Sequence, residues 1–294
     1  MKRKNLWVRI KEERSAYLFI LPSVVMFFAL VALPIILTFV YSFQKRNLVK
    51  ADWVGFDQYI DIFTDPVFLT ALKNTLLFVV VLVPVIVMAA FFISLQVTPL
   101  NHKTRIFFRA VFYLPVVVSG VIISMIWLWI FNANYGLLNY LIGVFGIEPV
   151  EWLASKYTLY YLMFVVFSFN LGVPFIIYVA AMGNIPKQLL EVARIDGAKK
   201  RTITWKIIFP LLRPVTFFLI VTQTIFVFMV FVVIQLLTAG GPAHSTETVI
   251  FQLYRTAFQF LEFGRASAMG VSLLIFVLII SLIQKFVAGK DINY

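Results

Sequence analysis

Long apolar stretches alternate with short charged ones along almost the whole chain. Asp, Glu, Lys and Arg are absent from six stretches, each about as long as the roughly 20 residues that a helix needs to cross a bilayer. This pattern predicts six membrane-spanning helices, and the first is too long for a signal peptide, so we expect an uncleaved anchor. The predicted spans are Tyr17–Phe43, Asn74–Val97, Ala110–Phe131, Tyr157–Met182, Pro214–Thr238 and Ala266–Gln284.

The composition agrees with a chain that lies in lipid. Hydrophobic residues make up 62% of the 294 residues and charged residues 13%. Globular proteins have about 45–50% and about 25%. A soluble enzyme, a disordered tail and a nucleic-acid-binding domain are therefore excluded, and the predicted fold class is an all-α membrane protein with six transmembrane helices.

The basic residues are divided unevenly between the two sides of the membrane. With six spans both termini lie on one side, and that side carries 18 of the 25 Lys and Arg residues. The positive-inside rule then places both termini in the cytoplasm. The formal net charge of +12 thus reports orientation and gives no sign of a nucleic-acid partner.

These assignments divide the chain into five parts. We expect a basic cytoplasmic tail, the first transmembrane helix, an external loop, a five-helix domain and a short cytoplasmic tail. The five-helix domain contains a cytoplasmic loop at 184–213 between the fourth and fifth spans. In chain order the five parts are 1–16, 17–43, 44–73, 74–284 and 285–294.

Few residues in the chain suit catalysis or metal binding. Every Asp, Glu, Lys and Arg lies outside the six spans, which argues against an ion antiporter and an intramembrane hydrolase. Cysteine is absent, and the two histidines, His102 and His244, lie far apart. We therefore predict no catalytic residue, no metal site and no cofactor in this chain. A membrane scaffold or sensor remains an alternative, and a lipid-modifying enzyme is a weaker one.

Polar and helix-breaking residues interrupt the fourth and fifth spans at mid-depth. Gly172 and Pro174 weaken the fourth helix beside Ser168 and Asn170, and Gln223 lies inside the fifth. Broken helices at this depth often mark substrate sites. An ordinary proline kink packed by neighbouring helices is the other interpretation, and the pattern alone favours neither.

The loop between the fourth and fifth spans contains two short helical patterns. Pro186 marks a helix start, and Leu189, Ala193 and Gly197 share one face at four-residue spacing. We expect the first helix to end or bend near Gly197 and a second helical segment to follow from Arg201 to Phe209. The basic residues alone would also suit a helix that lies among lipid headgroups.

The spacing in this loop resembles the EAA loop of ABC transporter permeases. That motif reads EAA, three residues, G, nine residues, I, one residue, LP. Val192 and Phe209 depart from it, but both are apolar. Five of the seven specified positions match, namely Glu191, Ala193, Gly197, Ile207 and Pro210. The resemblance implies a coupling helix on an ATPase, with Glu191 in a polar docking contact and Gly197 at the turn.

The resemblance extends over nearly the whole chain. Segments such as Tyr17–Pro22, Trp53–Tyr59 and Thr238–Thr248 are similar to sugar-importer permeases, among them the larger maltose-transporter permease and the glycerol-phosphate and multiple-sugar permeases. This implies a type I ABC importer permease fold in a bacterial or archaeal cytoplasmic membrane. The implied partners are a second homologous permease, two cytoplasmic ATPases, an extracellular or periplasmic solute-binding protein, the sugar substrate and membrane lipid.

Nucleotide chemistry is expected in other chains. The sequence contains no GxxxxGK[ST] phosphate-binding loop. ATP and Mg would therefore be bound by the partner ATPase subunits. The predicted function is a permease subunit that imports a carbohydrate, an oligosaccharide in the first instance, and the alternative is a glycerol-phosphate or acidic-sugar importer of the same family.

The resemblance to the maltose-transporter permease also implies a substrate site. Val227 and Val230 stand where that permease has asparagines, so the sugar contacts must differ from those for maltose. Asn170 is added to the implied set because of its polarity. The expected lining residues are Ser168, Asn170, Leu171, Gly172, Phe175, Gln223 and Phe226.

Overall fold

The computed structural model describes residues 14–288, and the chain falls into two compact units. The first unit combines residues up to Ile62 with Thr256–Val271, and the second combines Phe63–Arg255 with the residues from Ser272 onward. The N-terminal tail that the sequence predicts lies mostly outside the described residues, as do the last residues of the C-terminal tail. Each unit is considered by itself.

The first unit contains the first apolar span, a β-hairpin and a short helix. A π-helical turn, η1 (Phe28–Ala32), links two α-helical parts, because Pro34 lacks the N–H that a regular α-helix would use there. The elements are α2 (Arg14–Phe27), η1, α3 (Leu33–Tyr41), β1 (Gln44–Arg46), β2 (Ala51–Trp53), α4 (Asp57–Thr64) and the start of α17 (Phe263–Ala288).

The hairpin is an addition to the all-helical fold that the sequence predicts. β1 and β2 pair antiparallel, with Gln44 opposite Trp53. Asn47 closes the turn, since its side-chain oxygen accepts hydrogen bonds from the backbone N–H groups of Val49 at 3.0 Å and Lys50 at 2.8 Å. Phe43 packs on the Trp53 ring, with 5.9 Å between centroids. The stretch predicted as an external loop therefore has a small aromatic core.

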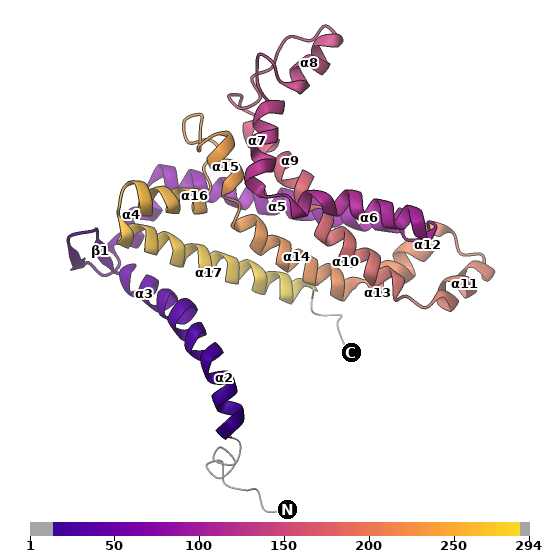
Figure 1. The fold of residues 1–294 in the computed structure, drawn as a ribbon, viewed down its shortest axis with the longest axis horizontal. Helices are drawn as coiled ribbons and strands as arrows, with labels where there is room; N and C mark the ends of the chain where they lie inside the picture. The colour runs from indigo at the N-terminus through magenta and orange to yellow at the C-terminus, as the bar shows by residue number, and fades with distance from the viewer. Residues whose placement is uncertain (1–13, 289–294) are drawn as a thin grey trace, which may run out of the picture. The chain divides into compact units, whose positions relative to one another are not determined.

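The second unit is a helical bundle around α5 (Pro66–Val97), a helix of 32 residues (Figure 1). Asp65 caps its start by accepting a hydrogen bond from Val67 N at 2.8 Å, so the helix begins eight residues before the predicted Asn74. The other elements are α6 (His102–Val117), α7 (Gly120–Ile130), α8 (Leu137–Val144), α9 (Thr158–Asn170), α10 (Gly172–Gly183), α11 (Lys187–Ile195), α12 (Lys200–Ile203), η2 (Thr204–Ile208), α13 (Phe209–Leu211), α14 (Arg213–Phe228), α15 (Val232–Leu237), α16 (Val249–Tyr254) and the rest of α17. A further π-helical turn, η3 (Arg255–Gln259), begins at the last residue of the segment Phe63–Arg255 and belongs mostly to the first unit.

Within residues 14–288 the helices provide four to six candidate membrane crossings. Four segments are long and apolar enough to cross a membrane without a sharp bend. Two further pairs, α6 with α7 and α9 with α10, qualify when each bent pair counts as one span. The predicted helical fold class is confirmed, although two spans are not straight. The four segments are Tyr17–Tyr41, Pro66–Val97, Arg213–Leu237 and Phe263–Phe286.

The third span is not the single helix over Ala110–Phe131 that the sequence predicts. α6 begins at His102 and ends at Val117, and α7 leaves at 95° to it after an extended Val118. Ser119 starts the new helix because its hydroxyl oxygen accepts a hydrogen bond from Val121 N at 3.3 Å. The N-cap at Ser119 thus divides into two helices a stretch whose apolar sequence predicts one.

The fourth span bends where the sequence predicts a break. α9 and α10 meet at Leu171 with an angle of 45°. Gly172 lets α10 approach α6 closely, since a Cβ atom there would lie 2.3 Å from the carbonyl oxygen of Phe112. The rings of Phe112 and Phe175 continue this contact, with 4.9 Å between centroids.

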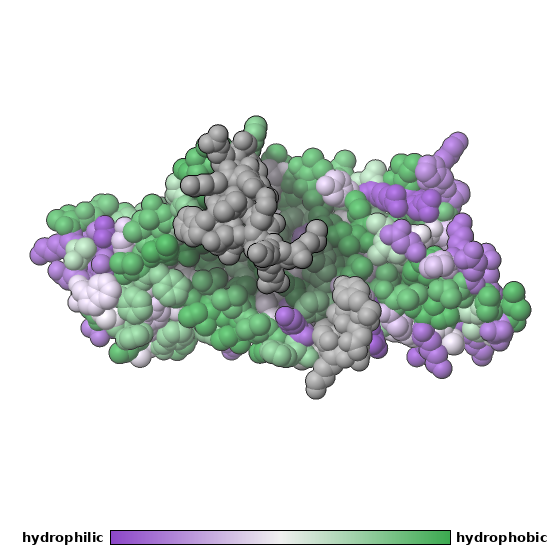
Figure 2. All heavy atoms as spheres, turned by 90° about the horizontal axis from the view of Figure 1, so that it is seen from below, coloured by the Kyte–Doolittle hydropathy of each residue, from purple (hydrophilic) through white to green (hydrophobic). Residues whose placement is uncertain are grey.

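Charged and apolar residues are segregated along the second unit. In the space-filling view hydrophobic residues cover the flanks of the helices, and hydrophilic residues gather at the end where α11 and α12 lie (Figure 2). Phe91, near the C-terminus of α5, contacts the ring of Trp205 in η2 at 6.3 Å. The basic loop between the fourth and fifth spans therefore lies at the C-terminal end of α5.

We expect Gly172→Ala to destabilise the bundle by about 1–3 kcal/mol, the usual cost of overpacking a tight contact. The added methyl group would meet backbone, which cannot rotate away. Gly183→Ala is the control, because it lies in the same helix and a Cβ there meets nothing within 4 Å. Thermal unfolding of both variants in detergent measures the difference, and equal midpoints would contradict the close packing of α10 on α6.

Candidate functional site

The segment between the fourth and fifth spans forms two helical halves separated by a turn. α11 begins after Pro186, and the second half runs through α12, η2 and α13 to α14 at Arg213. Pro210 lies in α13, shortly after the π-helical turn η2. The wider backbone of this turn accommodates a proline, which has no N–H for a regular helical hydrogen bond. The two helices predicted from the sequence are confirmed, with the first ending at Ile195.

Gly197 makes the turn between the halves. Its φ angle of 78° is in the left-handed region that favours glycine. The N–H of Gly197 donates to Arg194 O at 3.0 Å, and the N–H of Ala198 donates to Ala193 O at 2.9 Å. This pair of bonds is a Schellman motif, which ends α11 and satisfies its last carbonyl groups. The small side chain of Ala193 lies one turn before the cap.

Most side chains of α11 are exposed. Glu191 is exposed, and so are Leu189, Val192 and Ile195, which form a row at three-residue spacing. Ile195 is 85% exposed. An amphipathic helix with an apolar row that the chain itself leaves uncovered is suited to a groove on another protein.

The second half is anchored to the bundle by aromatic rings. Trp205 lies 5.3 Å from Phe209 and 6.3 Å from Phe92, measured between ring centroids. Phe209 also contacts Phe91 of α5 at 5.7 Å. Ile207 lies in the same turn and is half-buried. The segment therefore combines an exposed first helix with a second half fixed to α5.

The two amides predicted in the fourth and fifth spans contact each other. The side-chain NH₂ of Asn170 donates to the side-chain oxygen of Gln223, and the two residues are 7% and 5% exposed. Burying an amide without a partner is costly, so each of these side chains stabilises the other inside the bundle. The pair lies at the bend between α9 and α10 and joins it to α14.

The other predicted lining residues lie in different surroundings. Ser168 accepts a hydrogen bond from the indole N–H of Trp127 at 3.2 Å. Leu171 and Phe175 are buried and pack within the bundle. Phe226 is 38% exposed and contacts the ring of Phe169 at 6.4 Å. The structure thus brings Asn170 and Gln223 together, keeps Leu171, Gly172 and Phe175 in packing contacts and leaves Phe226 on the surface of α14.

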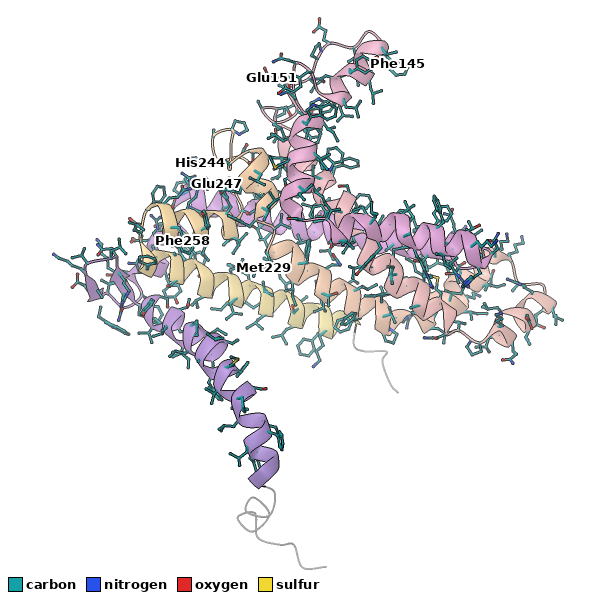
Figure 3. The ribbon with its side chains drawn as sticks, in the orientation of Figure 1. Phe145, Glu151, Met229, His244, Glu247 and Phe258 are labelled. Carbon is teal, nitrogen blue, oxygen red and sulfur yellow. The ribbon has the colours of Figure 1, made fainter. Side chains whose placement is uncertain are left out.

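A buried charge cluster was not predicted from the sequence. Glu247 is 1% exposed, and its carboxylate accepts a hydrogen bond from Arg255 at 2.6 Å and lies 2.6 Å from Nδ1 of His244 (Figure 3). Asn74 of α5 donates to the carbonyl oxygens of Ser245 and Glu247, both at 2.9 Å. The cluster ties the loop before α16 to α5. The spacing of His, Glu and Arg was the available signal, but loop charges were counted only for orientation.

A second polar centre organises the loop after α7. Asn139 is 6% exposed and donates to the carbonyl oxygens of Ala133 and Val150 at 2.9 and 3.0 Å. Its own oxygen accepts from Val150 N at 3.1 Å and from the indole of Trp152 at 2.9 Å. All four hydrogen-bonding positions of the amide are filled. Beyond this centre the loop exposes apolar residues such as Phe145 (Figure 3).

Metal chemistry has no obvious place in the part of the chain that the structure describes. Within residues 14–288 no three His, Cys, Asp or Glu residues are grouped so that they could hold a metal ion. Some of the buried polar side chains bind one another, as in the Asn170–Gln223 and Arg255–Glu247 contacts. These features define a polytopic membrane protein with bent spans and an exposed loop helix.

Comparison with protein families identifies this class. Residues 86–290 match the model for the binding-protein-dependent transport system inner membrane component. The chain belongs to this family, and the predicted resemblance to ABC importer permeases is confirmed. The family comprises membrane components of transport systems, which agrees with a chain that is not an enzyme by itself.

Individual relatives cover almost the whole chain. The probable ABC transporter permease protein YesP of Bacillus subtilis is 32% identical over 290 residues, which are 97% of this chain and 93% of the relative. The sn-glycerol-3-phosphate transport system permease protein UgpA of Agrobacterium fabrum is 29% identical over 289 residues, 94% of this chain and 98% of the relative.

Solved structures share the fold. A chain of a bacterial ABC transporter involved in the import of the acidic polysaccharide alginate superposes with a TM-score of 0.87 at 23% identity, over 98% of this chain and 99% of that chain. A second structure, of a bacterial alginate ABC transporter in complex with an alginate pentasaccharide-bound periplasmic protein, gives a TM-score of 0.85 at 23% identity, over 96% of each chain.

We expect Asn170→Leu to lower the stability by about 1–3 kcal/mol, because it leaves the amide of Gln223 buried without its partner. The double variant Asn170→Leu with Gln223→Leu should recover part of this loss, since both polar groups are then removed. Thermal unfolding of the two single variants and the double variant measures the coupling. Additive losses would show that the two amides do not depend on each other.

Proposed function

We propose that this chain is a permease subunit of an ATP-driven importer and that it translocates a carbohydrate across the cytoplasmic membrane. The observation that carries the proposal is the segment from α11 to α13, which has the spacing of the EAA loop, a glycine turn at Gly197 and an aromatic anchor on α5. The family assignment and the names of the relatives support it.

The proposed complex contains several other chains. A second homologous permease would complete the translocation path, two cytoplasmic ATPases would bind ATP and Mg, and an external solute-binding protein would deliver the substrate. The exposed row on α11 suits the ATPase contact, because it is apolar and its loop also carries the basic residues Lys199, Lys200 and Arg201. Movement of α11 would reach α5 through Trp205 and Phe209.

A carbohydrate suits the polar residues at the bend of the fourth span. The amides of Asn170 and Gln223 can exchange their mutual hydrogen bond for bonds to substrate hydroxyl groups. Ser168 and Phe226 lie on the same two spans and complete the proposed lining with Leu171, Gly172 and Phe175. Arg255 is held by Glu247, and Arg265 lies 3.8 Å from Glu262, which favours a neutral sugar over an anionic one.

An anionic substrate is the second candidate, because the relatives with named substrates transport glycerol 3-phosphate or an acidic polysaccharide. The two candidates differ in the charge of the solute that stimulates the complex. Neutral oligosaccharides, glycerol 3-phosphate and uronate oligomers can be compared directly. Neutral oligosaccharides should stimulate ATP hydrolysis most strongly if the amides of Asn170 and Gln223 line the substrate site.

Reconstitution tests the function as a whole. Proteoliposomes that contain this chain, its partner permease, the ATPases and the binding protein should show sugar-stimulated ATP hydrolysis and sugar uptake. Vesicles with inactivated ATPase subunits are the control, and uptake that persists in them would exclude an ATP-driven importer. If Asn170 and Gln223 are inaccessible to water-soluble probes in every state, a scaffold or sensor is favoured instead.

A separate prediction concerns the coupling segment. Gly197→Pro should reduce co-purification of the ATPases by at least roughly tenfold, because proline fixes φ near −65° and cannot adopt the positive φ of this turn. Gly146→Pro is the matched control, since Gly146 has a φ of 74°, makes the same kind of N–H bond to a residue three positions earlier and lies in the loop after α8.

The deletion of residues 187–199 gives a second variant for the same contact. It removes α11 and its turn, and it should abolish ATPase binding while the purified permease pair remains intact. Undiminished co-purification after this deletion would count against a docking role for α11. Loss of binding in the Gly146→Pro control would show that backbone strain anywhere in the chain, and not the turn at Gly197, is responsible.

A further inference from the structure

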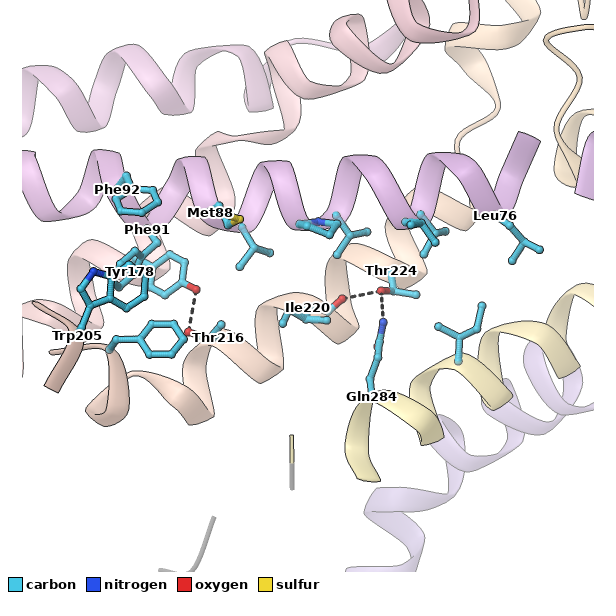
Figure 4. A pocket seen from close by; sticks show the side chains of 17 residues that line it. Leu76, Met88, Phe91, Phe92, Tyr178, Trp205, Thr216, Ile220, Thr224 and Gln284 are labelled. Atoms are coloured by element: carbon cyan, nitrogen blue, oxygen red, sulfur yellow. Dashed lines mark hydrogen bonds between the residues drawn. The ribbon is translucent and has the colours of Figure 1, made fainter. Parts of the chain in front are cut away.

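One face of α5 lines a long apolar groove (Figure 4). The lining residues of α5 recur at intervals of three and four positions from Leu76 to Phe92, which is one helix face over about 24 Å. Residues of α10, η2, α13, α14 and α17 form the other walls, and all of them belong to the second unit. The cavity has a volume of about 550 Å³.

The polar groups of the groove are mostly occupied by one another. Tyr178 donates to Thr216 at 2.9 Å, and Gln284 donates to the hydroxyl of Thr224 at 2.8 Å (Figure 4). Within residues 14–288 the amide oxygen of Gln284 accepts no hydrogen bond. One acceptor is too few to replace the water around a sugar. The groove is therefore suited to an apolar ligand and is separate from the bend at Asn170.

The groove follows α5 for about 24 Å, and apolar side chains line nearly all of that length. This length and this lining suit a hydrocarbon chain.

One end of the groove opens beside basic residues. Trp205 lines the groove and also a second hollow of about 390 Å³, whose other walls are Arg201, Thr202 and Lys206. Trp205 contacts Phe91 and Phe92, so this opening lies at the C-terminal end of α5. The positive-inside rule assigns that end to the cytoplasmic face, where anionic lipid headgroups attract basic pockets between helices.

We propose that the groove is a binding site for an anionic phospholipid. One acyl chain lies along α5 between Leu76 and Phe92, and the phosphate lies against Arg201 and Lys206. The apolar lining and the length of the groove suit the chain, and the basic residues at its end suit the headgroup. Trp205 lies where chain and headgroup meet, the usual position of tryptophan in membrane proteins. The bound lipid would stabilise the contact between α5 and the second half of the loop that joins α10 to α14.

Lipid retention by the purified permease pair tests the headgroup contact. Native mass spectrometry after exposure to equal amounts of phosphatidylglycerol and phosphatidylcholine, with the same acyl chains, should show preferential retention of phosphatidylglycerol. Arg201→Gln with Lys206→Gln should lower this preference by roughly tenfold or more, since each cation near an anionic headgroup contributes about fivefold. Lys199→Gln with Lys200→Gln is the control, because it removes the same charge from the same loop outside the hollow.

A preference that falls equally in both double variants would overturn the proposal, because it would reflect the charge of the loop as a whole. So would equal retention of the two lipids by the unaltered chain. All four side chains are exposed, so these changes do not disturb the packing of the bundle.

The acyl chain is tested by filling the groove. Val80→Trp should displace the chain and lower the retention of both lipids severalfold, while Val85→Trp, on the same helix and exposed outside the groove, should not. Equal retention by these two variants would contradict the proposal. The chain has no cysteine, so Val80→Cys provides a single thiol. Efficient crosslinking from it to the partner permease would also overturn the proposal, because a protein segment would then occupy the groove.

Discussion

A peptide group in hydrocarbon has no water to bind, and this constraint governs where the helices of this protein can bend. α5 is continuous, but α6–α7 and α9–α10 are sharply bent, and α14 is separated from α15 by residues 229–231. At the two sharp bends a side chain meets a backbone or amide group: Ser119 caps α7, and Asn170 pairs with Gln223 beside the end of α9. Ser94 of α5 donates to the carbonyl oxygen of Phe175 at 3.1 Å, one turn into α10. Polar side chains thus lie at both sharp bends, and others, such as Ser94, lie within regular helix.

Local signals made much of the fold predictable. Apolar runs identified the spans, and Pro186 and Gly197 bounded the first loop helix because helix starts and ends depend on neighbouring residues. The 95° bend at Val118 was missed because the run from Ala110 has no charged residue, and Ser119 and Gly120 were counted as part of one apolar helix. The polarity of Asn170 and Gln223 was evident, but a contact between residues 53 positions apart depends on tertiary packing. The neighbours His244 and Arg255 of Glu247 are close in sequence, but its burial depends also on the distant Asn74 of α5, which the sequence did not reveal.

The two halves of the loop between α10 and α14 differ in how firmly they are packed against the bundle. Its first half exposes an apolar row, and its second half is held by rings against the longest helix of the bundle. A flexible link would absorb any displacement imposed on α11, but the Schellman motif at Gly197 fixes the geometry between the halves. The same arrangement places Trp205 between α5 and the basic residues, so protein and lipid contacts converge on one turn.

The amide of Asn139 has a consequence for how this family can diversify. Because all four of its hydrogen bonds are made within residues 133–152, the loop that it organises needs no support from the spans for its polar core. Such a loop can change independently of the rest of the chain. It can be lengthened, or exchanged between relatives at its two ends, while the helices that it connects keep their packing. Such changes would alter the surface that this loop presents without rebuilding the spans.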